Sequence, residues 1–90
     1  MNKEMLLEKL KELDLPYEVA GFEDKEQIYV CARDAYKKKK EHPNKYKDLY
    51  LPYCRVSFHT GGKIYVRDNG LCHYVNKHQL MEILERLAVE

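Results

Sequence analysis

Two glycine-containing turns divide the stretch between residues 53 and 75 into three segments in which apolar and polar residues alternate. Thr60-Gly61-Gly62 separates the first segment from the second, and Asn69-Gly70 separates the second from the third. Asn-Gly is the strongest short signal for a β-hairpin, because both central residues of a type I′ turn need positive φ. Strict alternation is typical of strands that bury one face. The stretch therefore predicts three consecutive antiparallel strands, at 53–59, 63–68 and 71–75.

The lengths of these turns also predict which residues face one another. A three-residue turn at 60–62 places Arg55 opposite Arg67, and a two-residue turn at 69–70 places Arg67 opposite Cys72. Both registers assign the same residues to one apolar face, although a slip of one residue would have inverted a strand. This predicted core face contains Val56, Phe58, Ile64, Val66, Leu71 and Val75, with His73 on the same side.

Amphipathic helices are predicted at both ends of the chain. Residues 2–14 and 77–88 each carry apolar side chains at helical spacing, with charged residues between them. Pro16 prevents the first helix from continuing, because its ring clashes with the preceding turn. Asn76 and Gln79 have the spacing of a capping box at the start of the second helix. The apolar residues concerned are Met5, Leu6, Leu10 and Leu13 in the first helix, and Leu80, Ile83, Leu84 and Leu87 in the last.

Two more strands and a lysine-rich insert lie between the first helix and the three-stranded stretch. Residues 17–22 and 27–33 alternate in polarity and are separated by the polar turn 23–26. Within the insert, at 34–49, Asp34 is a candidate cap for a short helix over residues 35–41. Pro43 would end that helix.

The fold class follows from the order of these segments, α-β-β-(basic insert)-β-β-β-α. A chain of 90 residues has room for one core. We expect one α+β domain over residues 1–90, a two-layer sandwich in which an antiparallel sheet of four to five strands packs against the N- and C-terminal helices.

The second face of the predicted sheet carries the candidate binding residues. Residues 27–67 contain ten Lys or Arg against three Asp or Glu, although the whole chain has a net charge of +1. Arg55 and Arg67 are predicted to face one another, which is unfavourable for like charges unless an anion lies between them, and the arginine fork suits phosphate or carboxylate. Tyr29 and Arg33 join this face if the strand at 27–33 presents its apolar row inward. The candidate binding residues are Tyr29, Arg33, Lys37, Lys38, Tyr53, Arg55, His59, Lys63, Tyr65, Arg67 and Tyr74.

Basic side chains interleaved with aromatic rings are what a sheet that binds single-stranded nucleic acid needs. We therefore expect a non-catalytic binding module for an anionic partner, most simply nucleic acid. Tyr and Arg are also enriched at protein interfaces. The alternative is an inhibitor of the kind that phages and mobile elements use, which would block a host defence nucleoprotein, as anti-CRISPR proteins do, or sequester a nucleotide signal. A solvated sheet face without a specific partner is a further possibility.

Catalytic and metal-binding functions are less well supported by the sequence. His59 beside Lys63 or Arg67 could serve phosphodiester cleavage in a small nuclease or phosphodiesterase, but a second acid–base group with a clear role is missing. The four His and three Cys lack the short spacings of zinc sites, so neither a metal nor a cofactor is expected. The chain has no apolar run long enough to span a membrane and no signal-peptide pattern at its start, and we expect a cytoplasmic protein that does not bind membranes. A homodimer is possible.

Overall fold

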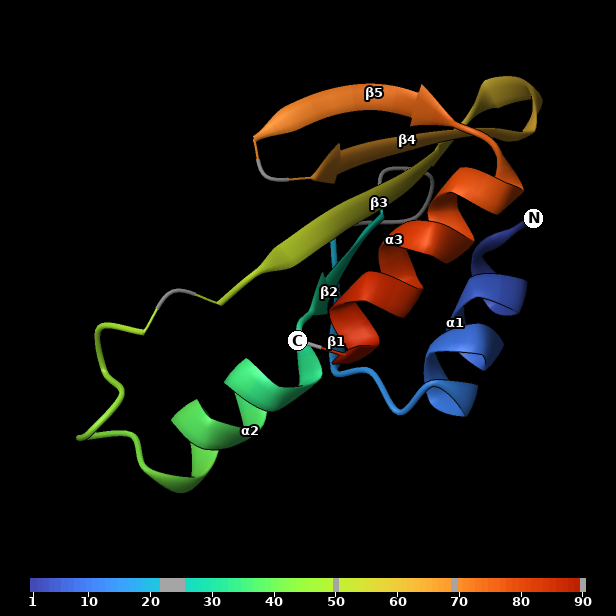
Figure 1. Ribbon diagram of the computed structural model, residues 1–90. Helices are drawn as coiled ribbons and strands as arrows, with labels where there is room; N and C mark the ends of the chain where they lie inside the picture. Colours follow the sequence, from blue (N-terminus) through green and yellow to red (C-terminus); the bar gives the residue numbers. More distant parts are fainter. Residues whose placement is uncertain (22–25, 50, 69, 90) are drawn as a thin grey trace.

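The residues that the structure describes form three α-helices and a five-stranded sheet (Figure 1). The computed structural model describes residues 1–21, 26–49, 51–68 and 70–89. The elements are, in chain order, α1 (Lys3–Glu12), β1 (Tyr17–Ala20), β2 (Gln27–Cys31), α2 (Arg33–Glu41), β3 (Tyr53–His59), the single 3-10 turn η2 (Thr60–Gly62), β4 (Lys63–Asp68), β5 (Leu71–Val75) and α3 (Lys77–Val89). This arrangement confirms the predicted α+β fold class.

The sheet is an antiparallel meander in which each strand pairs with the next along the chain, in the order β1-β2-β3-β4-β5. Both registers predicted from turn length are confirmed: Arg55 lies opposite Arg67, and Arg67 lies opposite Cys72. Gly61 and Gly62 have φ values of 81° and 76°, which glycine adopts at no steric cost. Asn69, the first residue of the second predicted turn, lies outside the described residues.

Local sequence accounts for where the two terminal helices begin. The Asn2 side chain accepts a hydrogen bond of 2.9 Å from the backbone N–H of Met5, which caps α1. At α3 the predicted capping box is present: the backbone N–H groups of Asn76 and Gln79 each donate to the side-chain oxygen of the other residue, at 2.8 Å. These bonds satisfy N–H groups that have no partner within the helix.

Helices α1 and α3 pack side by side on one face of the sheet, and the core lies between the two layers (Figure 1). The helices bury their apolar stripes there, with Met5 the exception at 44% exposed. At the edge of this layer, Arg86 of α3 donates to both carboxylate oxygens of Asp68 in β4, at 2.8 and 2.7 Å. The core comprises Leu6, Leu10, Leu15, Ile28, Val30, Ala32, Cys54, Val56, Ile64, Val66, Val75, Leu80, Ile83, Leu84 and Leu87.

The prediction that Leu71 belongs to the core is wrong. Leu71 and His73 do point to the helical side of the sheet, as the registers require, but Leu71 is 70% exposed and His73 is exposed too. The reason is that β5 is an edge strand, and only its last residue, Val75, is buried. Phe58, also predicted for the core, is partly buried against it.

The strand predicted over residues 27–33 ends earlier, at Cys31. The backbone N–H of Ala32 donates to the Pro52 carbonyl, and the Ala32 carbonyl then accepts from Tyr36 in the first turn of α2. Arg33 is therefore the first residue of a helix. Ala32 is the N-cap residue and makes no side-chain cap bond, so the predicted cap at Asp34 is wrong as well. Phe22 and the turn residues 23–25, which complete the first predicted strand and its connection, lie outside the described residues.

Candidate nucleic-acid interface

The outer face is the side of the sheet opposite α1 and α3. Its register follows from the core face, because side chains alternate between the two sides of a strand. Eight of the eleven candidate residues lie on it. They are Tyr29 in β2, Tyr53, Arg55 and His59 in β3, Lys63, Tyr65 and Arg67 in β4, and Tyr74 in β5.

One row across the outer face holds the two arginines. Tyr29, Arg55 and Arg67 lie opposite one another on β2, β3 and β4. Directly opposite residues of an antiparallel pair have Cβ atoms about 4.5–5.5 Å apart. The side chains of Arg55 and Arg67 form no ion pair or hydrogen bond with another residue of the described ranges. We call these two residues the arginine pair. The row continues to Glu18 of β1, which lies opposite Tyr29. Tyr29 therefore lies between the Glu18 carboxylate and the arginine pair.

Three rings form an aromatic cluster beside the arginine pair: His59, Tyr65 and Tyr74. The His59 and Tyr65 rings are stacked with centroids 5.1 Å apart, and Tyr74 meets both edge-on, at 5.6 Å from His59 and 5.1 Å from Tyr65. Tyr74 remains 56% exposed. The Lys63 ammonium lies 5.7 Å from the centre of the Tyr74 ring, within the range of a cation–π contact. The cluster therefore combines exposed aromatic surface with a positive charge.

His59 is held by hydrogen bonds on both ring nitrogens. Its Nδ1 lies 3.2 Å from the Tyr74 hydroxyl and its Nε2 lies 3.3 Å from Oγ of Ser57. A serine–imidazole pair is one part of a nucleophilic site, but the other nitrogen here meets a phenol, and no carboxylate of the described ranges is within ion-pair distance of His59. A catalytic histidine of that kind uses such a carboxylate to stabilise its charged form. The bonds fix the ring in one orientation on the sheet.

The protonation of nearby groups follows from their surroundings. A side-chain hydrogen bond with Cys72 is the main cause that holds the pKa of the Tyr65 phenol above its usual value, and desolvation is the second. Burial, reinforced by Glu18, raises the pKa of the Cys31 thiol. Burial, reinforced by Asp68, raises the pKa of Cys54 to about 12. Neither Cys31 nor Cys54 is therefore an activated thiol.

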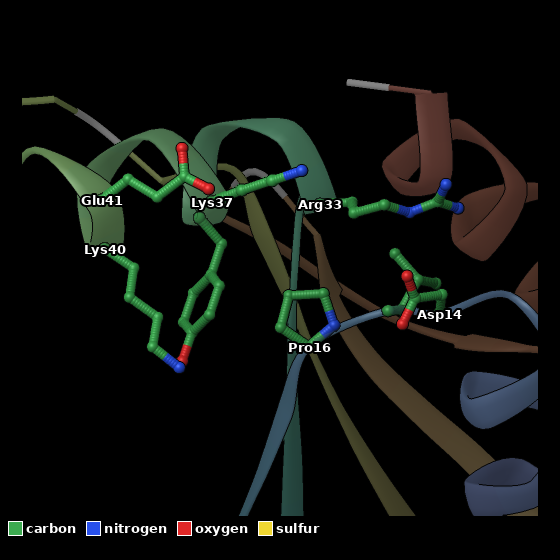
Figure 2. A pocket seen from close by; sticks show the side chains of 8 residues that line it. Asp14, Pro16, Arg33, Lys37, Lys40 and Glu41 are labelled. Carbon is green, nitrogen blue, oxygen red and sulfur yellow. The ribbon is translucent and has the colours of Figure 1, made fainter.

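Three candidate residues do not lie on the outer face. Arg33, Lys37 and Lys38 all belong to α2. Arg33 and Lys37 line a separate pocket between α2 and the connection from α1 to β1 (Figure 2), which corrects the expectation that Arg33 joins the sheet surface. Lys38 is exposed elsewhere on the helix.

Three residues beside the candidate binding residues were not among the candidates. Ser57 lies within hydrogen-bond distance of His59, and Tyr36 and Lys40 line the pocket with Arg33 and Lys37. A signal for Tyr36 and Lys40 was present. Tyr36 and Lys40 follow Arg33 by three and seven residues, the spacing that places side chains on one face of a helix. Helical spacing from Arg33 therefore predicts that Tyr36, Lys37 and Lys40 share one face of the helix with it.

The described residues contain no cluster of three or more His, Cys, Asp or Glu side chains that could hold a metal ion. None of the described helices is long and apolar enough to cross a membrane. Comparison of the chain with models of protein families, with curated proteins and with solved structures finds no match.

Proposed function

We propose that the outer face binds single-stranded nucleic acid and that the protein acts as a non-catalytic binding module. The observation that carries the proposal is the arginine pair, two like charges held opposite one another without an anionic partner among the described residues. A backbone phosphate between the two guanidinium groups would relieve their repulsion and accept bonds from both.

Tyrosine rings on either side of the arginine pair supply stacking surfaces. Tyr29 lies beside Arg55, and its ring is 6.1 Å from that of Tyr53. On the other side the aromatic cluster exposes Tyr74. Stacking on an aromatic side chain contributes about 1–3 kcal/mol per base and is available only where bases are unpaired. Because duplex bases are already stacked within the helix, this arrangement favours a single strand over a duplex.

The test is fluorescence anisotropy with labelled single-stranded RNA, single-stranded DNA and duplex DNA across a range of salt concentrations. Each phosphate that the protein neutralises contributes about −0.7 to the slope of log K against log salt for a single strand, and the arginine pair supplies one such contact. We expect Arg55→Ala to weaken binding and to reduce that slope by about 0.7. Tyr74→Ala, which removes the exposed ring of the aromatic cluster, should weaken binding by about 1–3 kcal/mol with little change in the slope.

The matched control is Lys11→Ala, which removes one positive charge from α1 on the opposite layer. It should leave the affinity for single strands unchanged. Absence of binding at low salt, or equal losses in Arg55→Ala and Lys11→Ala, would rule the proposal out. In that case an inhibitory contact with a host protein becomes the leading explanation of the outer face. Such an interface would be recognised by its kinetics, because truncating an aromatic residue at a protein interface changes mainly the off-rate.

A further inference from the structure

The pocket beside α2 is a second candidate binding site, distinct from the outer face. Its volume is about 430 Å³, within the range of about 300–1,000 Å³ that small-molecule sites occupy. Helix α2 forms one wall, and the connection from α1 to β1 forms the other (Figure 2). The lining residues are Arg33, Tyr36, Lys37, Lys40 and Glu41 from α2, and Asp14, Leu15 and Pro16 from the connection.

The cationic side chains of the pocket are not neutralised within the described structure. Arg33, Lys37 and Lys40 form no ion pair with any residue of the described ranges. One terminal nitrogen of Arg33 donates to the backbone carbonyl of Leu13, which fixes the guanidinium against the connection. The Nε of Arg33 is buried and has no hydrogen-bond partner among the described residues. A buried N–H without an acceptor is costly to the fold, but a ligand in the pocket does not reach this atom, because protein covers it.

Two carboxylates limit where such an anion can lie. Asp14 lines the pocket near Arg33, and Glu41 lines it at the opposite end, with the Lys37 ammonium reaching between them over Pro16 (Figure 2). Together with Arg33 and Lys40, the lining carries three positive and two negative groups. The centre of the pocket therefore suits an anion, whereas its ends suit groups that donate hydrogen bonds. A ligand that carries both kinds of group matches this lining better than a bare anion.

Apolar surface occupies the rest of the lining. Leu15 is buried, Pro16 presents its ring, and Tyr36 is 38% exposed. The Lys40 ammonium lies 6.0 Å from the centre of the Tyr36 ring. An aromatic ring can stack on Tyr36 while an anionic group reaches the lysines. A nucleoside phosphomonoester has this combination of a planar base, hydroxyl donors and a phosphate.

A neighbouring cavity shares two lining residues with this pocket and extends to Tyr29 of the outer face. Pro16 and Tyr36 line both spaces, and the second cavity, of about 380 Å³, also contacts Tyr29 and Cys31. Tyr29 is the outer-face residue that lies opposite Arg55. A strand lying along the outer face past Tyr29 would therefore bring its end towards the pocket.

From these contacts we infer that the pocket between α2 and the connection from α1 to β1 binds a nucleoside phosphomonoester. The phosphate lies at the Lys37 ammonium, and the base lies on Tyr36 beside Lys40 (Figure 2). The nucleoside phosphomonoester can be a free mononucleotide or the phosphorylated end of a bound strand. Only the strand end rests on the function proposed for the outer face.

Isothermal titration calorimetry with adenosine 5′-monophosphate, adenosine and inorganic phosphate tests the pocket directly, at constant ionic strength. We expect the mononucleotide to bind more tightly than either fragment. The double variant Lys37→Ala/Lys40→Ala should lose at least about tenfold in affinity, because charge-assisted hydrogen bonds are lost. The control Lys38→Ala/Lys47→Ala removes the same charge outside the pocket lining and should bind like the unaltered protein. No mononucleotide binding, or equal losses in both double variants, would overturn the inference.

A second titration separates the two sources of the ligand. Oligonucleotides with a 5′-phosphate or a 3′-phosphate are compared with the same sequence lacking terminal phosphates. If one terminal phosphate raises the affinity for the oligonucleotide, and this increase disappears in Lys37→Ala/Lys40→Ala, the ligand of the pocket is a strand end. If only the free mononucleotide binds at the pocket, the ligand is a free nucleotide. Arg55→Ala should weaken every oligonucleotide and leave mononucleotide binding unchanged. If oligonucleotides bind but mononucleotides do not, and terminal phosphates have no effect on affinity, the pocket inference alone is refuted. If mononucleotides bind but oligonucleotides do not, only the function proposed for the outer face is refuted.

Discussion

Arg55 on β3 and Arg67 on β4 lie directly opposite one another on the outer face of the sheet. Like charges in this position destabilise a strand pair, and neither guanidinium has an ion-pair partner among the described residues. Arg86 provides a contrast, since it meets the carboxylate of Asp68 on the other side of the same sheet. The fold thus places one arginine in an ion pair and leaves two facing each other.

Arg55→Ala should leave the protein as stable as before or raise its free energy of unfolding by up to about 1 kcal/mol, because the repulsion across β3 and β4 is removed. Urea denaturation followed by circular dichroism measures the change. Arg55→Lys keeps the charge and serves as the control, with a stability close to that of the unaltered protein. A clear loss of stability in Arg55→Ala would mean that the arginine side chain stabilises the sheet in the absence of a ligand.

Separating Asp68 from Arg86 should destabilise the protein. The Asp68 side chain is only 14% exposed, whereas that of Arg86 is 43% exposed and solvent screens the pair in part. A partly exposed ion pair of this kind contributes about 1 kcal/mol or less. A double-mutant cycle with Asp68→Asn and Arg86→Gln measures the coupling between the two side chains, which should be favourable and about 0.5–1 kcal/mol. A coupling of zero would show that the contact is not maintained in solution.

Gly61→Ala should destabilise the hairpin between β3 and β4 by about 1–2 kcal/mol. Gly61 has a φ of +81°, a conformation that places Cβ of an L-residue too close to the following carbonyl. A Cβ at this position meets no other atom within 4 Å, so the cost comes from backbone strain alone. Gly61→Asn should cost less, because asparagine tolerates left-handed backbone. Thermal denaturation checks the order, and equal losses in the two variants would contradict it.

Alkaline pH should reduce stability through the Cys54 thiol. Its pKa is raised from 9.0 to about 12 by burial and by Asp68. Between these pH values the unfolded chain releases the proton while the folded chain retains it, so the free energy of unfolding falls as pH rises. The loss from this group is about 2 kcal/mol between pH 9 and about pH 10.5. Urea denaturation at both pH values measures it. Cys54→Val lacks the thiol and should lose less stability over the same interval, and identical losses would exclude Cys54 as the cause.

Strand pairing within residues 53–75 and the division of those residues between the two faces were predictable from local sequence. The turn at 60–62 and the alternation of polarity around it determine that Arg55 meets Arg67, and the structure has this register. The physical reason is that side chains alternate with a period of two, so a register is specified once a turn length and an apolar face are known. Eight of the eleven candidate binding residues lie on the expected face for that reason.

The extent of burial was not predictable in the same way. The polarity of Leu71 suits a core position, but its exposure depends on how far α3 extends over the edge strand β5. That distance depends on how α3 packs against the sheet, and the alternation of polarity along β5 does not reveal it. A period of two identifies a face of the sheet without indicating what covers it.

Sequence by itself determined the helices at both ends, the registers of β3 with β4 and of β4 with β5, and the basic, aromatic composition of the outer face. Tertiary structure alone decided that Arg33 belongs to α2 and donates to the carbonyl of Leu13, and that Tyr36 and Pro16 line the same pocket. Registers and caps depend on residues a few positions apart, whose spacing constrains the backbone directly. The pocket depends on contacts between residues about twenty positions apart, which form only when α2 packs against the connection from α1 to β1.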